Sequence, residues 1–197
     1  LKGMKIAIMG CIVNGPGDDT FPQLLTALEK DANIDSIQNL IYKRGEEIIK
    51  TTQAPLGDQD QLPQLPYEYL DHQYPISRYL GRTFLGKRTA AYHSSMGCPF
   101  TCSFCAVVPI YNARWKGKSA SLIYKDIQYL ITNHGADAVE FHDNNFFVSE
   151  KRTVEFSNLI RNEKIKWWGE GRIDTVDKYS DSSLEAMREA GCTMIFF

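Results

Sequence analysis

The chain has 197 residues and a formal net charge of −2, with 43% hydrophobic and 23% charged residues. This composition is typical of a folded globular chain and excludes an intrinsically disordered one. The small net charge gives no whole-chain attraction to nucleic acid or to an anionic membrane, and no apolar run reaches the ~20 residues that cross a bilayer.

The first part of the chain predicts a small α/β region. Residues 4–13 are mostly apolar and end in a turn, which predicts a strand, and a helical pattern begins at Thr20. Residues 41–50 predict a hairpin that turns at Gly45. We therefore place an N-terminal α/β domain remnant at residues 1–50.

A proline-rich stretch follows this region. Half of the eight prolines lie between positions 51 and 78, among scattered polar residues without a clear period. Such a composition predicts a linker that runs over a surface, and we assign residues 51–87 to it.

From residue 88 to the end, strands and helices alternate. The helices are expected to begin at Ser119, at Ser149 and at a capping box formed by Ser182 and Glu185. Strands are predicted at residues 89–94, 136–142, 165–171 and 192–197. Repeated strand–helix units form a parallel sheet covered by helices, and both an open sheet and a barrel fit this pattern.

Three cysteines follow the first of these strands with the spacing C-x3-C-x2-C: Cys98, Cys102 and Cys105. Spacings this short place three thiols within reach of one metal centre. Three thiolates on a four-iron cluster leave the fourth iron open to a small molecule. Five cysteines in all, three of them in one loop, do not match a secreted disulfide framework, so we expect a reducing cytoplasm.

Two other sites fit the same three cysteines. One is a zinc site, for which His93 is the nearest fourth ligand, and the other is an electron-transfer cluster completed by Cys11 or Cys192. The chain lacks the second C-x2-C pair that a zinc site normally offers. The loop also follows a strand end, where α/β folds place their chemistry, so an open-iron cluster is favoured over a non-catalytic iron–sulfur or zinc module.

Residues 97–105, GCPFTCSFC, resemble the cluster loop of the radical S-adenosylmethionine (SAM) superfamily. Residues 79–197 are similar to its subgroup with a cobalamin-binding domain, through RTFLGKRTAAYHSSMGCPFTCSFCAVVP, FHDNNFF and AGCTMIFF. The resemblance implies a TIM-type partial (β/α)6 barrel, of which residues 88–197 are the N-terminal part, truncated after about four strands. It also implies a [4Fe–4S] cluster on the three cysteines, with SAM cleaved to a 5′-deoxyadenosyl radical or, with cobalamin, methyl transfer.

Further site residues follow from strand ends and from this resemblance. Asp143 and Asn144 close the second strand of the predicted barrel, where polar groups serve either a cofactor or a turn. Arg172 closes the third strand and suits the SAM carboxylate, and Glu170 suits its amine or ribose, although an internal Glu170–Arg172 ion pair fits equally. Phe104, the aromatic residue before the last cysteine, is assigned to the cofactor as well.

The resemblance also implies partners and further chain. We expect an unidentified small-molecule substrate and an electron donor resembling flavodoxin or ferredoxin. Residues 1–50 resemble the end of a Rossmann-like cobalamin-binding domain but lack its Asp-x-His-x-x-Gly fingerprint, so any cobalamin ligand would lie upstream of Leu1. The chain ends inside an apolar strand, which indicates a fragment that is inactive alone if part of the SAM pocket is missing.

A second, short resemblance concerns residues 9–17. This stretch is similar to the iron–sulfur segment of hydroxymethylbutenyl diphosphate synthase, in which a cysteine and a glutamate seven residues later bind the cluster. Asp18 stands where that family has the glutamate, and the C-x2-C partner is missing. We interpret the match as coincidence and Cys11 as an ordinary strand cysteine.

Overall fold

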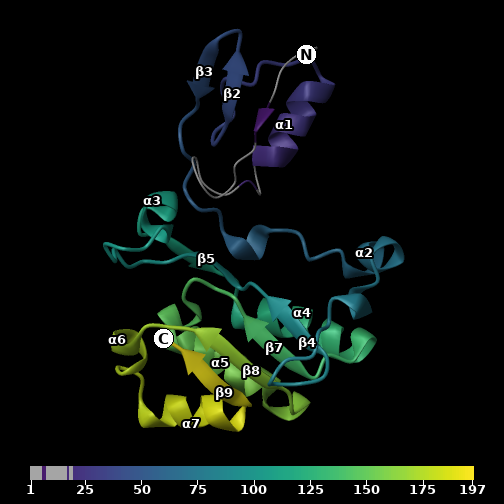
Figure 1. Cartoon of the computed structure of the whole chain (residues 1–197), viewed down its shortest axis with the longest axis vertical. Coiled ribbons are helices and arrows are strands. Elements are labelled where there is room, and N and C mark those ends of the chain that lie inside the picture. The colour runs from purple at the N-terminus through teal and green to yellow at the C-terminus, as the bar shows by residue number, and fades with distance from the viewer. Residues whose placement is uncertain (1–5, 8–16, 18–19) are drawn as a thin grey trace. The chain divides into compact units, whose positions relative to one another are not determined.

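The computed structural model describes residues 6–7, 17 and 20–197, and they form two compact units (Figure 1). We call them the N-terminal unit, Leu1–Gly57 with Pro99–Trp115, and the sheet unit, Asp58–Cys98 with Lys116–Phe197. The domain boundaries expected from the sequence, after residues 50 and 87, stay predictions.

The N-terminal unit has a three-stranded antiparallel sheet in the order β1-β2-β3. Its elements are β1 (Ile6–Ala7), α1 (Thr20–Glu29), β2 (Ile41–Arg44), β3 (Glu47–Lys50) and α3 (Val107–Tyr111). The helix at Thr20 and the hairpin are confirmed, and Gly45 takes the left-handed φ of +62° that the hairpin turn requires. The predicted strand at 4–13, including Cys11, otherwise lies outside the described residues.

The proline-rich stretch contains helices that the sequence pattern did not predict. They are α2 (Tyr67–Gln73) and two short 3₁₀ helices, Gln59–Gln61 and Ile76–Arg78. A contact of its first residue stabilises α2, because the Tyr67 ring stacks on Tyr129 with the ring centroids 5.2 Å apart. Helices this short depend on tertiary contacts rather than on a periodic apolar face.

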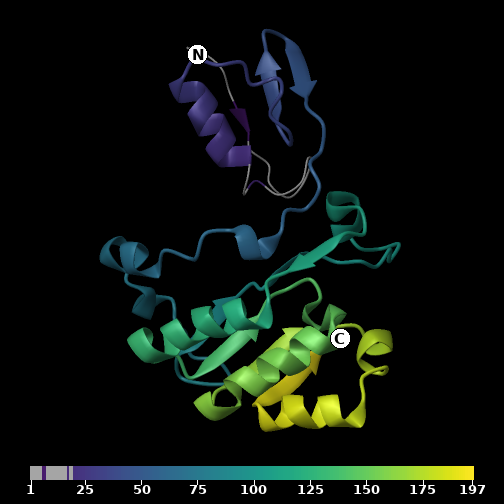
Figure 2. The ribbon, with the colours of Figure 1, turned by 180° about the vertical axis from the view of Figure 1, so that it is seen from behind.

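The sheet unit is built on a four-stranded parallel sheet in the order β4-β7-β8-β9 (Figures 1 and 2). Its strands are β4 (Thr89–Tyr92), β7 (Ala138–Phe141), β8 (Lys166–Glu170) and β9 (Cys192–Phe196). Its helices are α4 (Ala120–His134), α5 (Glu150–Ile160), α6 (Ile173–Val176) and α7 (Asp181–Glu189), with 3₁₀ turns at Phe146–Val148 and Arg161–Glu163. The expected α/β class with a parallel sheet is confirmed.

Between β4 and α4, the short strands β5 (Ser95–Gly97) and β6 (Trp115–Gly117) form a separate two-stranded sheet. The sequence predicted a single strand up to Ser94 and nothing at residues 115–117. The chain therefore leaves the main sheet after Tyr92 and rejoins it at β7, after passing through α4.

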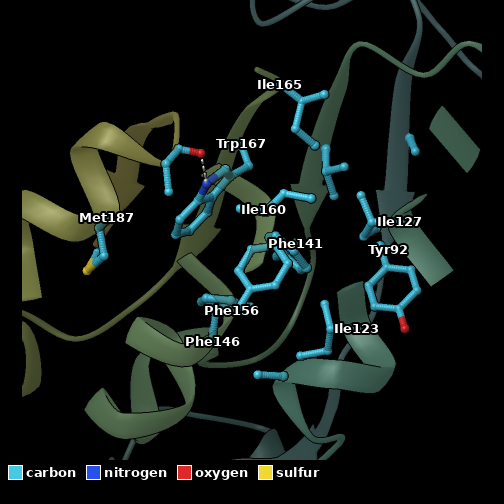
Figure 3. Close-up of a cluster of buried hydrophobic side chains, with 14 of the residues drawn as sticks. Tyr92, Ile123, Ile127, Phe141, Phe146, Phe156, Ile160, Ile165, Trp167 and Met187 are labelled. Carbon is cyan, nitrogen blue, oxygen red and sulfur yellow. Dashed lines mark hydrogen bonds between the residues drawn. The ribbon is translucent and has the colours of Figure 1, made fainter. Parts of the chain in front are cut away.

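One face of the parallel sheet packs against the long helices through an aromatic core (Figure 3). Trp167 lies at its centre, with its indole N–H donating to the Ala190 carbonyl oxygen at 3.0 Å. Its ring meets Phe141 edge-on, with centroids 5.8 Å apart, and both side chains are fully buried. Burial of large side chains is the main favourable contribution to folding, so this core holds the strand ends in place.

The helix caps are partly those that the sequence predicted. Ser119 and Ser149 accept hydrogen bonds from the N–H groups of Leu122 and Arg152, so the expected starts of α4 and α5 are confirmed. The expected capping box at Ser182 is wrong, because Ser180 caps α7 and accepts from the Ser183 N–H. None of the described helices is long and apolar enough to cross a bilayer.

Candidate functional site

The carboxyl ends of the parallel strands form one edge of the sheet unit. Phe141 on β7 pairs in register with Tyr92 on β4 and with Gly169 on β8, so the strands end side by side. Parallel sheets bind their ligands at this edge, where the loops after neighbouring strands meet. Glu170 is the last residue of β8, and Asn144 and Arg172 follow the ends of β7 and β8, as the sequence predicted.

The three cysteines of the predicted cluster are present as partly buried thiols. Cys98 ends one segment of the sheet unit, directly after Gly97, whose φ of +77° lets the backbone turn where a side chain would be strained. Cys102 and Cys105 belong to the N-terminal unit, where the Cys105 N–H donates to the Cys102 carbonyl oxygen at 3.1 Å. Such a turn brings its first and fourth Cα atoms within about 7 Å.

The chemistry of these donors fits an iron–sulfur cluster, because thiolates are the ligands that such clusters take. Phe104 lies in the turn between the last two cysteines, and its side chain is 90% exposed. Within the described residues, no group of three His, Cys, Asp or Glu side chains is already gathered for a metal ion. The ligand set therefore stays a prediction.

Asp143 is fully buried, and its carboxylate is used by the chain itself. It accepts from the Ser94 N–H at 3.1 Å and from the Ser94 hydroxyl at 2.9 Å. The Ser95 hydroxyl donates to the same carboxylate. The predicted contact between Asp143 and SAM stays a prediction, while the bonds that the structure shows connect the end of β7 to the residues before the cysteine loop.

Arg152 on α5 is a site residue that the sequence reasoning missed. Its side chain is only 7% exposed, and its guanidinium donates to the Ser94 hydroxyl at 3.1 Å and to the Lys118 carbonyl oxygen at 3.3 Å. A further bond of 3.0 Å reaches the Phe146 carbonyl oxygen. Burial lowers the pKa of Arg152, and the nearby negative charge of Asp143 opposes this effect. In the sequence, this arginine is indistinguishable from a solvent-exposed helix residue.

A second buried polar cluster joins β4 to α4. The Tyr92 hydroxyl donates to the Asp126 carboxylate at 2.5 Å, and the Lys118 ammonium lies 3.0 Å from the same oxygen. Burial and the bond to Asp126 raise the pKa of Tyr92, so its hydroxyl stays protonated as a donor. This cluster fixes Lys118 just before α4, and the Lys118 ammonium is paired with the Asp126 carboxylate.

The remaining predicted residues lie at the strand ends with different surroundings. Asn144 is exposed and Glu170 is partly buried. The ion pair that the structure shows for Arg172 is with Asp174, through two bonds of 2.9 and 2.7 Å. Asp174 therefore orients the guanidinium that the sequence assigned to the SAM carboxylate.

The sheet face opposite the aromatic core also carries polar and aromatic groups. His142 lies 3.5 Å from the Glu140 carboxylate and meets Trp168 edge-on, with centroids 5.5 Å apart. The Trp168 indole N–H is buried without a hydrogen-bond partner among the described residues. The alternation of strand residues was a usable signal, since Glu140 and Trp168 alternate with the core residues Phe141 and Trp167.

Cys192, the alternative fourth cluster ligand, is the first residue of β9 and so lies at the amino ends of the parallel strands, whereas the cysteine loop lies beyond the carboxyl end of β4. Burial raises the pKa of its thiol to about 12, and its S–H donates to the Met194 carbonyl oxygen at 3.7 Å. Cys192 packs against the aromatic core instead.

Comparison with known proteins found no matching family model. Several curated proteins are similar over most of the chain. An uncharacterised methyltransferase of Pyrococcus horikoshii is 29% identical over 94% of this chain. An anaerobic magnesium-protoporphyrin IX monomethyl ester cyclase of Synechocystis is 28% identical over 91%, and the hopanoid C-3 methylase of Methylococcus capsulatus is 28% identical over 81%. The chain spans 39%, 35% and 28% of these three relatives.

Among solved structures, the chain is similar to the radical SAM methyltransferase TsrM of Kitasatospora setae with tryptophan and a SAM analogue bound. The TM-score is 0.63 at 17% identity, covering 93% of this chain and 36% of TsrM. The same enzyme with cobalamin and a [4Fe–4S] cluster matches with a TM-score of 0.62 at 16% identity. At these identities the likeness shows the fold, which is an α/β fold with a parallel sheet.

Proposed function

We propose that the chain is part of a radical SAM enzyme of the cobalamin-binding subgroup, as its similarity to methyltransferases and cyclases supports, and that its cysteine loop holds a [4Fe–4S] cluster that binds SAM at an open iron. The observation that carries this proposal is the position of the C-x3-C-x2-C loop. It begins beyond the end of β4, the first strand of the parallel sheet, with Cys98 directly after β5. Three thiolates leave one iron without a protein ligand.

The chain's own residues would bind and orient the cofactor. Cys98, Cys102 and Cys105 would hold the cluster as thiolates. Arg172, already oriented by Asp174, would face the SAM carboxylate, and Glu170 would accept from the amine or ribose. When bound, the cluster supplies the electron that splits SAM into methionine and a 5′-deoxyadenosyl radical.

We also propose that residues in the cysteine loop and after β7 contact the cofactor or support its site. Phe104 exposes an aromatic face suited to the adenine, and Asn144 offers an exposed amide at the end of β7. Asp143 would support the site mainly through Ser94 and Ser95, because its carboxylate is buried against them.

For the whole protein we propose methyl transfer or ring formation on a small molecule. This class rests on the names of the similar proteins, which are methyltransferases and cyclases. Strands β4, β7, β8 and β9 would be the first four of a partial (β/α)6 barrel. A flavodoxin-like or ferredoxin-like protein in the cytoplasm would supply electrons, and cobalamin would bind outside this chain.

The proposal is tested by anaerobic reconstitution of the full chain with iron and sulfide. We expect about four irons per chain and, after one-electron reduction with dithionite, an electron paramagnetic resonance spectrum that changes when SAM is added. Replacing Cys98, Cys102 or Cys105 by Ser should abolish cluster binding, whereas Cys192→Ser, the matched control, should retain it. One equivalent of zinc, or a cluster whose spectrum ignores SAM, would contradict the proposal.

A further inference from the structure

We propose that Arg152 and Asp143 form a clamp that fixes Ser94 and Lys118, the two residues that flank the segment 95–117 between β4 and α4, and thereby positions Cys98. The contacts that form the clamp are a property of the folded chain alone. The consequence for the cluster rests on the function proposed above. Neither residue needs to touch the cofactor, so both would be positioning residues.

The two ends of the segment meet at one place. The Lys118 N–H donates to the Ser94 carbonyl oxygen at 2.9 Å, which closes the neck of the segment. The Arg152 guanidinium donates to this same Ser94 oxygen at 3.4 Å and to the Lys118 carbonyl oxygen at 3.3 Å. One buried side chain on α5 therefore holds both ends.

Asp143 holds the outgoing end from the side of β7. Its carboxylate receives the N–H and hydroxyl of Ser94 together with the hydroxyl of Ser95. An ionised carboxylate only accepts hydrogen bonds, and all three of these partners are donors. The Ser94 hydroxyl lies between the two charges, donating to Asp143 and accepting from Arg152.

Because Asp143 and Arg152 are buried, their hydrogen bonds fix the positions of Ser94, Ser95 and Lys118. Asp143 is fully buried and Arg152 nearly so, and buried polar groups that lose their partners cannot regain them from bulk water. A second contact stiffens the arginine, because its guanidinium carbon lies 4.9 Å from the centre of the Phe146 ring.

Cys98 is close to the clamp along the chain, so a shift of Ser94 or Ser95 would also move Cys98. Two residues, Met96 and Gly97, separate Ser95 from Cys98, so the two positions are at most about 11 Å apart along extended chain. Gly97 turns the backbone between them, and Met96 and Gly97 continue the short strand β5. The position of Ser94 and Ser95 therefore sets where the Cys98 thiol is presented.

The clamp is tested first without any cluster, by hydrogen exchange of the chain of residues 1–197 in its apo form. In Arg152→Met, amides of residues 94–98 and 116–118 should exchange about tenfold faster, the change expected when a buried hydrogen bond to a charged group is lost. The control is Ile160→Ala on the same helix, which removes a fully buried side chain away from the clamp. It should lower overall stability without singling out these two stretches.

Two further variants keep the test decisive if Arg152→Met does not fold. Ser94→Ala removes the hydroxyl that both charges share and should speed exchange at the same amides, and Arg152→Lys should restore protection in part. Equal exchange in the clamp variants and in Ile160→Ala would overturn the proposal.

The second readout is the reconstituted cluster. We expect Arg152→Met to shift its electron paramagnetic resonance spectrum and midpoint potential relative to wild type, and Ile160→Ala to leave both unchanged. If the wild-type chain binds no cluster, the proposed function fails, while hydrogen exchange still decides the clamp. If the cluster forms and is identical in every variant, the consequence for Cys98 is wrong.

Discussion

Asp143 accepts both of the hydrogen bonds that Ser94 donates, at 3.1 Å from the backbone N–H and at 2.9 Å from the hydroxyl. This carboxylate follows β7, while the serine follows β4, the neighbouring parallel strand. The edge of the sheet at which the candidate site lies is therefore connected by side-chain bonds beyond the last backbone pair.

We expect Asp143→Ala to be strongly destabilising. It leaves the buried Ser94 and Ser95 donors without an acceptor, which costs about 1–3 kcal/mol for each group, and it removes a negative charge near the buried Arg152. Asp143→Asn keeps one acceptor oxygen and should cost less. Urea unfolding followed by circular dichroism measures both, and the exposed neighbour Asn144→Ala should change stability by less than about 0.5 kcal/mol. Equal losses for Asp143→Ala and Asn144→Ala would contradict the burial argument.

The thiol of Cys192 should resist alkylation in the folded chain. Burial raises its pKa to about 12, so the reactive thiolate is scarce at pH 8. With iodoacetamide and mass spectrometry, we expect Cys192 to be modified only after denaturation. Labelling of Cys192 in the native chain as fast as in urea would show that its burial is wrong.

The cap of α7 can be tested with two neighbouring serines. Ser180→Ala removes the side-chain acceptor for the Ser183 N–H and should lower the free energy of unfolding by about 0.5–2 kcal/mol. Ser182→Ala should have a much smaller effect, because residue 182 already lies inside the helix, where alanine is favoured. Thermal unfolding of both variants gives the order, and a larger loss for Ser182→Ala would restore the capping box expected from the sequence.

Acid should weaken the sheet unit through Asp137. Burial alone would raise the pKa of this carboxyl, but hydrogen bonds from the Arg88 and Lys87 N–H groups outweigh burial, and the pKa lies below its ordinary value of 3.8. Its contribution to stability is therefore complete above about pH 4 and is lost as pH falls through the lowered pKa. Unfolding free energies between pH 7 and pH 2 should fall less steeply for Asp137→Asn, and identical slopes would contradict this assignment.

The sequence predicted those elements whose signals are local. The alternation of strands and helices after residue 88 is confirmed because each long helix has its own cap and apolar face, as at Ser119 and Ser149. The start of α7 was misplaced because four successive residues, the serines 180, 182 and 183 and Asp181, all offer a side-chain acceptor. Only the three-dimensional path of the chain selects one of them.

The candidate site was less predictable for the same reason. The cysteine spacing and the polar strand ends are visible in the sequence, but the partners of the side chains are not. Arg152 lies 58 residues from Ser94, and nothing between them indicates a contact. Arg172 is followed two residues later by Asp174, and its ion pair with that residue depends on the turn into α6.

The closed neck between Ser94 and Lys118 also affects how freely this part of the chain can diversify. Because the Lys118 N–H reaches the Ser94 carbonyl oxygen, both ends of the intervening stretch are fixed at one point of the scaffold. Residues added inside such a stretch cost little conformational entropy, about 0.6 kcal/mol for each doubling of its length. The stretch is therefore a natural place for grafting: a counterpart of different length should be accepted at these two junctions while the helices and strands beneath it keep their packing.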